Sequence, residues 1–219
     1  MTHLNSLNRR HFTAIAVLGS LMGSSMAMAP AQPPALLVVG DSLSAEYGLR
    51  RGSGWVALLE QRLAAERHAV RVVNASISGD TTSGGRSRLP TLLRTHRPAI
   101  VLIELGGNDA LRGLPLDMTR ENLRTMVRDS QAAGARVLLL GMEMPPNYGA
   151  RYAEEFRQMY RAVADSEKVP LVPFFLKGVA DGPNPTALFQ PDRIHPNESA
   201  QPIMLDNVWP ALRNLLPTR

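Results

Sequence analysis

The chain has 219 residues, no cysteine and a formal net charge of +5, with 44% hydrophobic and 20% charged residues. This length and composition are typical of one globular domain with a sizeable core. The absence of cysteine excludes disulfides, thiolate metal sites and a cysteine nucleophile. The basic residues are scattered and are not interleaved with aromatic residues, so nucleic acid is not an expected partner.

The N-terminus has the pattern of an export signal. Arg9 and Arg10 precede a mostly apolar run that ends in Ala27-Met28-Ala29. A basic start, a short apolar middle and an Ala-x-Ala end are typical of a secretory leader, and the paired arginines indicate the twin-arginine type. A membrane anchor is the alternative, but the run is short and rich in Gly, Ser and Ala. We therefore expect residues 1–31 to be the leader and the start of a linker, residues 35–219 to be the domain, and the protein to be periplasmic or secreted.

After a proline-rich linker, short apolar runs alternate with segments of helical spacing, as in sheets whose strands are buried on both faces. The predicted strands cover residues 35–39, 70–73, 100–105, 137–140 and 171–174. The predicted helices cover 55–66, 89–95, a segment from an N-cap at Thr119 to Gly134, 152–167, and 200–216 with a bend at Pro210. This order predicts an α/β fold with a parallel sheet and helices on both faces. Ligands bind such sheets beyond the carboxyl ends of the strands.

One histidine is placed to act as a base. The chain has five: His3, His11, His68, His96 and His195. The first two belong to the predicted leader, and the next two are expected to be solvated or capping residues. His195 differs because Asp192 precedes it in the same loop, where a turn can bring the carboxylate to one imidazole nitrogen and leave the other free. The pattern Asp-x-x-His is common and is not by itself evidence of catalysis.

A base needs a nucleophile, and Ser42 follows the first predicted strand directly. Gly40 allows a sharp turn there, so Ser42 can project from the carboxyl edge of the sheet. From these residues alone, the alternative is that Asp41 or Ser42 caps the next helix. Asp41 and Asp192 could also be imagined as a glycosidase pair, but that would leave Ser42 and His195 without a role.

Two further loops supply hydrogen-bond donors. Gly79, after the second strand, can offer an unhindered backbone N–H, and Asn108, after the third strand, carries an amide. These donors suit a tetrahedral oxyanion. Phosphate binding by Gly106-Gly107 is the competing interpretation, although the chain has no P-loop and no GxGxxG motif. No HExxH motif and no histidine cluster is present, so neither a metal nor another cofactor is expected.

Taken together, four motif blocks resemble those of the SGNH, or GDSL, hydrolase superfamily. They are Gly-Asp-Ser-Leu at 40–43, the glycine block at 76–81, Gly-Gly-Asn-Asp at 106–109 and Asp-x-x-His-Pro at 192–196. The resemblance spans roughly residues 35 to 216. It is closest to the bacterial periplasmic acyl-thioesterase, arylesterase and lysophospholipase group, on the segments 106–113 and 145–149. The Gly-x-Ser-x-Gly elbow of ordinary α/β-hydrolases is absent at Ser42.

This resemblance implies a flavodoxin-like three-layer α/β/α sandwich. It implies Ser42 as nucleophile, His195 as acid–base, Asp192 as the orienting carboxylate, and Gly79 and Asn108 in the oxyanion hole with the Ser42 N–H. The expected function is hydrolysis of carboxylic esters, and of thioesters or lysophospholipids, by a monomer acting on a small acyl-ester or lipid substrate. The alternatives are a carbohydrate O-acetyl esterase of the same superfamily and, from another class, a non-catalytic periplasmic binding protein.

Two positions depart from the pattern of the group. Glu46 stands where a glycine is usual, and Arg193 replaces a small residue between Asp192 and His195. Both are expected to affect substrate preference and pH optimum more than the reaction itself. Residues around 110–116 and 144–149 are expected to shape the acyl pocket, by their position at strand ends and by analogy.

Overall fold

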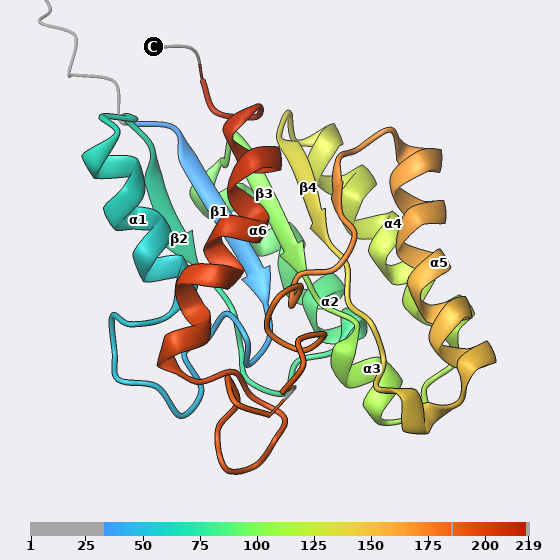
Figure 1. The fold of residues 1–219 in the computed structure, drawn as a ribbon. Helices are drawn as coiled ribbons and strands as arrows, with labels where there is room; N and C mark the ends of the chain where they lie inside the picture. Colours follow the sequence, from blue (N-terminus) through green and yellow to red (C-terminus); the bar gives the residue numbers. More distant parts are fainter. Residues whose placement is uncertain (1–32, 185, 218–219) are drawn as a thin grey trace, which may run out of the picture. The chain divides into compact units, whose positions relative to one another are not determined.

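The computed structural model describes residues 33–184 and 186–217, so the predicted leader lies outside the described residues. Five parallel strands form one sheet in the order β2-β1-β3-β4-β5 (Figure 1). The strands are β1 (Ala35–Gly40), β2 (Arg71–Asn74), β3 (Ile100–Glu104), β4 (Arg136–Leu140) and β5 (Leu171–Val172). The predicted number of strands and their parallel arrangement are confirmed.

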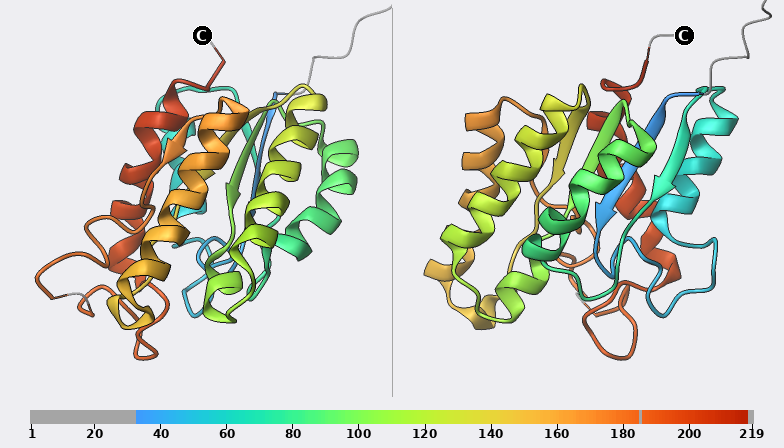
Figure 2. Two further views of the ribbon diagram at one scale, coloured as in Figure 1. Left: turned by 90° about the vertical axis from the view of Figure 1, so that its right-hand side faces the viewer. Right: turned by 180° about the vertical axis from the view of Figure 1, so that it is seen from behind.

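Helices cover both faces of the sheet, which makes three layers (Figure 2). The helices are α1 (Trp55–Ala65), α2 (Thr82–His96), α3 (Gly107–Leu111), α4 (Leu116–Ala132), α5 (Ala150–Glu167) and α6 (Gln201–Arg213), with 3-10 turns η1 (Pro146–Tyr148) and η2 (Glu198–Ala200). Leu36 and Val38 of β1 pack with α1 and α6, whereas Leu37 and Val39 pack with α2, α4 and α5. All four side chains are fully buried, because side chains alternate between the two faces of a strand.

Helix α2 begins well before its predicted start. Gly84, Gly85 and Pro90 weaken the helical pattern of the sequence, yet α2 starts at Thr82, and the side chain of its N-cap Thr81 accepts the N–H of Gly84 at 3.4 Å. Gly85 lets α2 pack closely, because a Cβ there would lie 2.3 Å from Leu105 Cδ1 and would displace that side chain. Tertiary contact therefore decides the helix, against the low intrinsic propensity of glycine.

The predicted N-cap at Thr119 is wrong. Helix α4 starts at Leu116, and Thr119 lies buried in its first turn, where its hydroxyl donates to Asp109 Oδ1 at 3.2 Å. The other end agrees with the prediction, because Gly134 follows the C-cap with a φ of 84°. Strand β5 is shorter than predicted and stops before Pro173, which has no N–H to donate to a neighbouring strand.

The parallel strands place the loops that follow them at one edge of the sheet, at the lower end of Figure 1. The segment between β5 and α6 reaches the same edge, where the N–H of Trp55 donates to Gln201 Oε1 at 3.0 Å. Segments that are distant in the sequence therefore meet beyond the carboxyl ends of the strands, as is usual for ligand sites in open α/β sheets.

Candidate active site

Ser42 lies in a tight turn directly after β1. The N–H of Ala45 donates to the carbonyl of Asp41 at 2.9 Å, and the N–H of Leu43 donates to the Asp41 carboxylate at 3.0 Å. The next helix begins only at Trp55 and has Gly54 as its N-cap. Ser42 therefore caps no helix, and its half-buried side chain is left at the carboxyl edge of the sheet.

His195 joins Ser42 to Asp192. The Nε2 atom of His195 lies 3.0 Å from Ser42 Oγ, and its Nδ1 atom lies 2.7 Å from Asp192 Oδ2. A carboxylate at Nδ1 favours the tautomer with its proton there, which leaves Nε2 as the acceptor that faces the serine hydroxyl. The three residues predicted from the sequence are thus brought together in the order Ser–His–Asp.

The carboxylate of Asp192 is held by its own loop. Its Oδ1 accepts the N–H groups of Ile194 at 3.0 Å and His195 at 3.1 Å. The hydrogen bond from the N–H of Ile194, followed by that from the His195 side chain, lowers the pKa of Asp192 to about 2. Asp192 therefore stays ionised across the physiological range and can stabilise a positive charge on the imidazole.

Asn108 lies beside the turn over residues 41–45, which carries Ser42 and is called the serine turn below. It is in α3, a short helix that sequence periodicity did not predict, and its Nδ2 donates to Asp41 Oδ2 at 2.9 Å. The chain enters α3 through Gly106, whose φ of 119° is rarely adopted by residues with a side chain. The amide of Asn108 is thereby tied to the residue that precedes Ser42.

Gly79 lies on the neighbouring loop with a φ of 78°. This loop is joined to β1 by the N–H of Ile77, which donates to the carbonyl of Gly40 at 3.0 Å. It is joined to the end of α3 by Arg112, whose guanidinium donates to the carbonyl of Gly79 at 2.7 Å. Gly79 and Asn108 are therefore carried by two segments that contact each other at the edge where Ser42 lies.

Asp109, the residue after Asn108, connects α3 to the end of the loop that carries Gly79. It is fully buried and accepts hydrogen bonds from the backbone N–H of Thr82 at 2.9 Å and from the hydroxyls of Thr82 and Thr119. The carboxylate thus holds the first residue of α2 against α3 and α4. A buried carboxyl group is retained where several donors satisfy it.

A buried carboxyl pair beneath Ser42 was missed by the sequence reasoning. Glu104, the last residue of β3, is 1% exposed, and its Oε2 lies 2.7 Å from Ser44 Oγ and 3.3 Å from the N–H of Asp41. Burial, and then the charge of Asp41, raises the pKa of Glu104 well above its usual value, while burial raises the pKa of Asp41 to about 6. The available signal was a single acid at the end of an otherwise apolar strand.

Glu46 and Arg193 share one backbone property. Both have a left-handed conformation, with φ of 59° and 58°. This conformation explains why a glycine is expected at position 46, since only glycine adopts it without a steric penalty. The carboxylate of Glu46 accepts the N–H groups of Gly52 and Gly54, which closes the loop after the serine turn.

Other candidate positions lie elsewhere. His68 was expected to be solvated or capping, but it packs edge-on against Trp209, with ring centroids 6.2 Å apart. Within residues 33–184 and 186–217, no group of three or more His, Asp or Glu side chains is placed to hold a metal ion.

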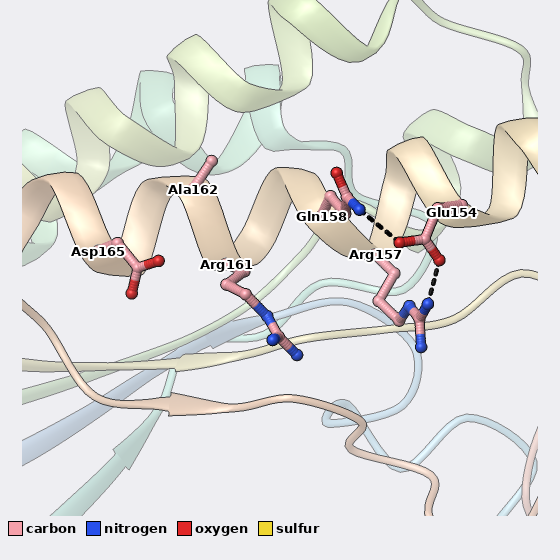
Figure 3. A pocket seen from close by; sticks show the side chains of 6 residues that line it. All are labelled: Glu154, Arg157, Gln158, Arg161, Ala162 and Asp165. Carbon is pink, nitrogen blue, oxygen red and sulfur yellow. Dashed lines mark hydrogen bonds and ion pairs between the residues drawn. The ribbon is translucent and has the colours of Figure 1, made fainter.

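A surface hollow runs along α5, where Glu154 accepts hydrogen bonds from Arg157 and Gln158 (Figure 3). None of the triad lines it.

Comparisons with known proteins identify related sequences. The model of the GDSL-like Lipase/Acylhydrolase family matches residues 38–201. Esterase TesA of Pseudomonas aeruginosa is 56% identical over 181 residues, which cover 83% of this chain and 89% of the relative. Thioesterase 1/protease 1/lysophospholipase L1 of Escherichia coli is 46% identical over 78% of this chain and 79% of the relative. The arylesterase of Vibrio mimicus is 44% identical over 76% of this chain and 82% of the relative.

Solved structures of esterases have the same fold as this chain. A crystal structure of TesA superposes with a TM-score of 0.80 at 56% identity, over 83% of this chain and 99% of that chain. The esterase EstA of Pseudoalteromonas sp., in a structure inhibited by monoethylphosphonate, has a TM-score of 0.77 at 40% identity, over 82% and 97% of the two chains. The family model matches well over half of the sequence, and the protein therefore belongs to the GDSL-like lipase/acylhydrolase family.

Proposed function

We propose that this protein hydrolyses carboxylic esters through an acyl-enzyme formed on Ser42. The observation that carries the proposal is the connected line from Ser42 Oγ to His195 Nε2, at 3.0 Å, and from His195 Nδ1 to Asp192, at 2.7 Å. Such an arrangement turns a weak hydroxyl nucleophile into a reactive one, because the base lies within reach of its proton.

The reaction has two halves. His195 takes the proton of Ser42 as Oγ attacks the acyl carbonyl, and the oxyanion is bound by the N–H groups of Ser42 and Gly79 and the amide of Asn108. Collapse of this intermediate breaks the ester bond, and the imidazolium returns its proton to the leaving alcohol. Water then attacks the acyl-enzyme with His195 again as base, which releases the acid and restores Ser42.

The proposed substrates are acyl and aryl esters, and by extension thioesters and lysophospholipids. This class is supported by the names of the relatives and by exposed apolar side chains at the edge of the sheet where the site lies. Six large hydrophobic side chains of the described residues are exposed, and all six lie in segments at the carboxyl edge of the sheet: Tyr47, Ile77, Leu111, Met118, Tyr148 and Ile194. Apolar surface at this edge suits an acyl chain or an aromatic alcohol better than a sugar.

We further propose that residues 1–31 direct export, that residues 35–219 form the hydrolase domain, and that it works as a monomer in the periplasm or outside the cell, without a metal. The basic and apolar pattern of the first residues supports export. Across the part of the chain that the structure describes, the helices are too short or too polar to cross a bilayer.

The test is turnover of p-nitrophenyl esters, from acetyl to dodecanoyl, by wild-type protein and by Ser42→Ala. We expect wild-type turnover that continues beyond acetyl, none above background in the variant, and labelling of Ser42 by an alkylphosphonate. Undiminished turnover by Ser42→Ala would rule out this nucleophile. Activity confined to acetyl groups on sugars would favour a carbohydrate esterase, and absence of both turnover and labelling would favour a binding protein.

A further inference from the structure

The ring of Tyr47 lies against the imidazole of His195. The two ring centroids are 4.3 Å apart, and the planes are tilted by 38°. Tyr47 follows the serine turn in the sequence, and its side chain is 49% exposed. The imidazole thus contacts an aromatic ring in addition to the serine hydroxyl and the Asp192 carboxylate.

The backbone on both sides of Tyr47 is held in the left-handed region. Glu46 has a φ of 59° and Gly48 a φ of 67°. A Cβ at position 48 would lie 2.0 Å from Gln190 Oε1, so a side chain there would displace the Gln190 amide. The strain at Glu46 is offset by its hydrogen bonds to the N–H groups of Gly52, at 3.0 Å, and Gly54, at 2.9 Å. Backbone strain that is kept in this way clusters at functional sites.

Gln190 fixes Tyr47 relative to the histidine loop. Its Nε2 donates to the carbonyl of Tyr47 at 2.8 Å and to the carbonyl of Pro196 at 3.1 Å. Its backbone N–H donates to the carbonyl of His195 at 2.7 Å. One residue therefore joins the backbone that carries the phenol ring to the backbone that carries the imidazole.

The contact matters when the imidazole becomes charged. After it takes the serine proton, the imidazolium contacts the carboxylate of Asp192 on its own loop and interacts with Asp41 only through charge, without a hydrogen bond. An aromatic ring within about 6 Å of a cation attracts it through the negative charge on the ring face. The same ring also limits rotation of the imidazole away from Ser42.

We propose that Tyr47 is a positioning residue that holds His195 in line with Ser42 Oγ and stabilises the imidazolium formed during the reaction. This role rests on the proposed function, since it requires His195 to act as the base. The two can fail separately: if the proposed function is wrong, the wild-type protein itself shows no Ser42-dependent turnover. If only the role of Tyr47 is wrong, the wild-type protein is active and its Tyr47 variants match it.

The test compares Tyr47→Leu and Tyr47→Phe by kcat and KM for p-nitrophenyl butyrate, from about pH 5 to about pH 9. Loss of the ring in Tyr47→Leu is expected to lower kcat by about three- to tenfold with KM nearly unchanged. The acid limb of the kcat/KM profile is expected to move to lower pH by about 0.5 to 1 unit. Tyr47→Phe keeps the ring face and should retain the wild-type values.

The control is Arg51→Ala, an exposed residue of the same loop, which should leave both kcat and the pH profile unchanged. Gln190→Leu is a second variant that keeps both rings but loses the bond to the Tyr47 carbonyl, and kcat should fall here too. Wild-type kcat in Tyr47→Leu or in Gln190→Leu would overturn the proposal. An equal loss in Tyr47→Leu and Tyr47→Phe, or an acid limb that moves to higher pH, would overturn it as well.

Discussion

The side-chain amide of Asn108 donates to the carboxylate of Asp41, with 2.9 Å between Nδ2 and Oδ2. Asp41 is 3% exposed and also accepts the N–H of Leu43, which shapes the turn that carries Ser42. An amide nitrogen has two hydrogens, so the bond to Asp41 leaves one for an oxyanion. A single buried carboxylate thus sets both the turn of the proposed nucleophile and the orientation of a proposed oxyanion donor.

This relationship predicts coupling between the two residues in catalysis. Asn108→Ala is expected to lower kcat by about 10²- to 10³-fold, the usual effect of removing one oxyanion donor. Asp41→Ala is expected to lower kcat as well, because the amide of Asn108 loses its support. The double variant should be hardly slower than Asn108→Ala in steady-state assays. Effects that multiply in the double variant would show that Asp41 acts independently of Asn108.

Replacement of Asp192 tests how the imidazole is oriented. In Asp192→Asn the amide can donate to Nδ1, which favours the tautomer with its proton on Nε2, where it cannot accept from Ser42. We expect kcat to fall by up to about 10⁴-fold while the fold is retained. The measurement is kcat at neutral pH, with far-UV circular dichroism as the check on folding. Near-normal kcat in a folded Asp192→Asn would mean that the carboxylate is not needed.

The raised pKa of Asp41 predicts a pH-dependent stability. Because burial raises it to about 6, folded Asp41 binds its proton more tightly than in the unfolded chain, where the pKa is about 4. Its stabilising contribution is therefore complete below about pH 4 and is lost as pH rises through about 6, a change on the order of 3 kcal/mol. Asp192 behaves oppositely, but its pKa of about 2 places that change outside this range.

The corresponding measurement is urea unfolding of wild-type protein and Asp41→Asn at about pH 5 and about pH 8. Asparagine does not titrate, so Asp41→Asn should gain stability relative to wild type at the higher pH. A stability difference between the two proteins that stays the same at both pH values would contradict the raised pKa.

Glu104 is expected to be a structural acid, because burial and the charge of Asp41 raise its pKa well above the usual value and favour the protonated form. Glu104→Gln keeps the size and the charge of that form, so it should change the free energy of unfolding by less than about 1 kcal/mol. Glu104→Ala leaves a cavity and removes the partner of Ser44, and should cost about 2 to 4 kcal/mol in chemical denaturation. A severe loss in Glu104→Gln would indicate an ionised carboxylate instead.

The local hydrophobic pattern of the sequence was enough to predict most of the strands and helices. Continuous apolar runs identified the central strands β1, β3 and β4, because a strand buried on both faces has no polar alternation. The edge strands were indicated by shorter apolar segments, which in β2 are interrupted by the exposed Arg71.

The local pattern was not enough where a contact distant in sequence decides the structure. The predicted helix over 89–95 starts too late, because α2 also includes Gly84 and Gly85, and Gly85 allows close approach to Leu105. Thr119 was predicted as an N-cap, yet its hydroxyl donates to the carboxylate of Asp109.

The sequence by itself determined which residue types stand at the strand ends, and so the candidates Ser42, Gly79, Asn108, Asp192 and His195. Only the tertiary structure decided that Ser42 and His195 meet within 3.0 Å, because they lie far apart in the chain and on opposite sides of four crossovers. The ring of Tyr47 on His195 and the buried Glu104 beneath Ser42 were decided in the same way. Contacts of this kind depend on backbone direction and burial, which no local spacing encodes.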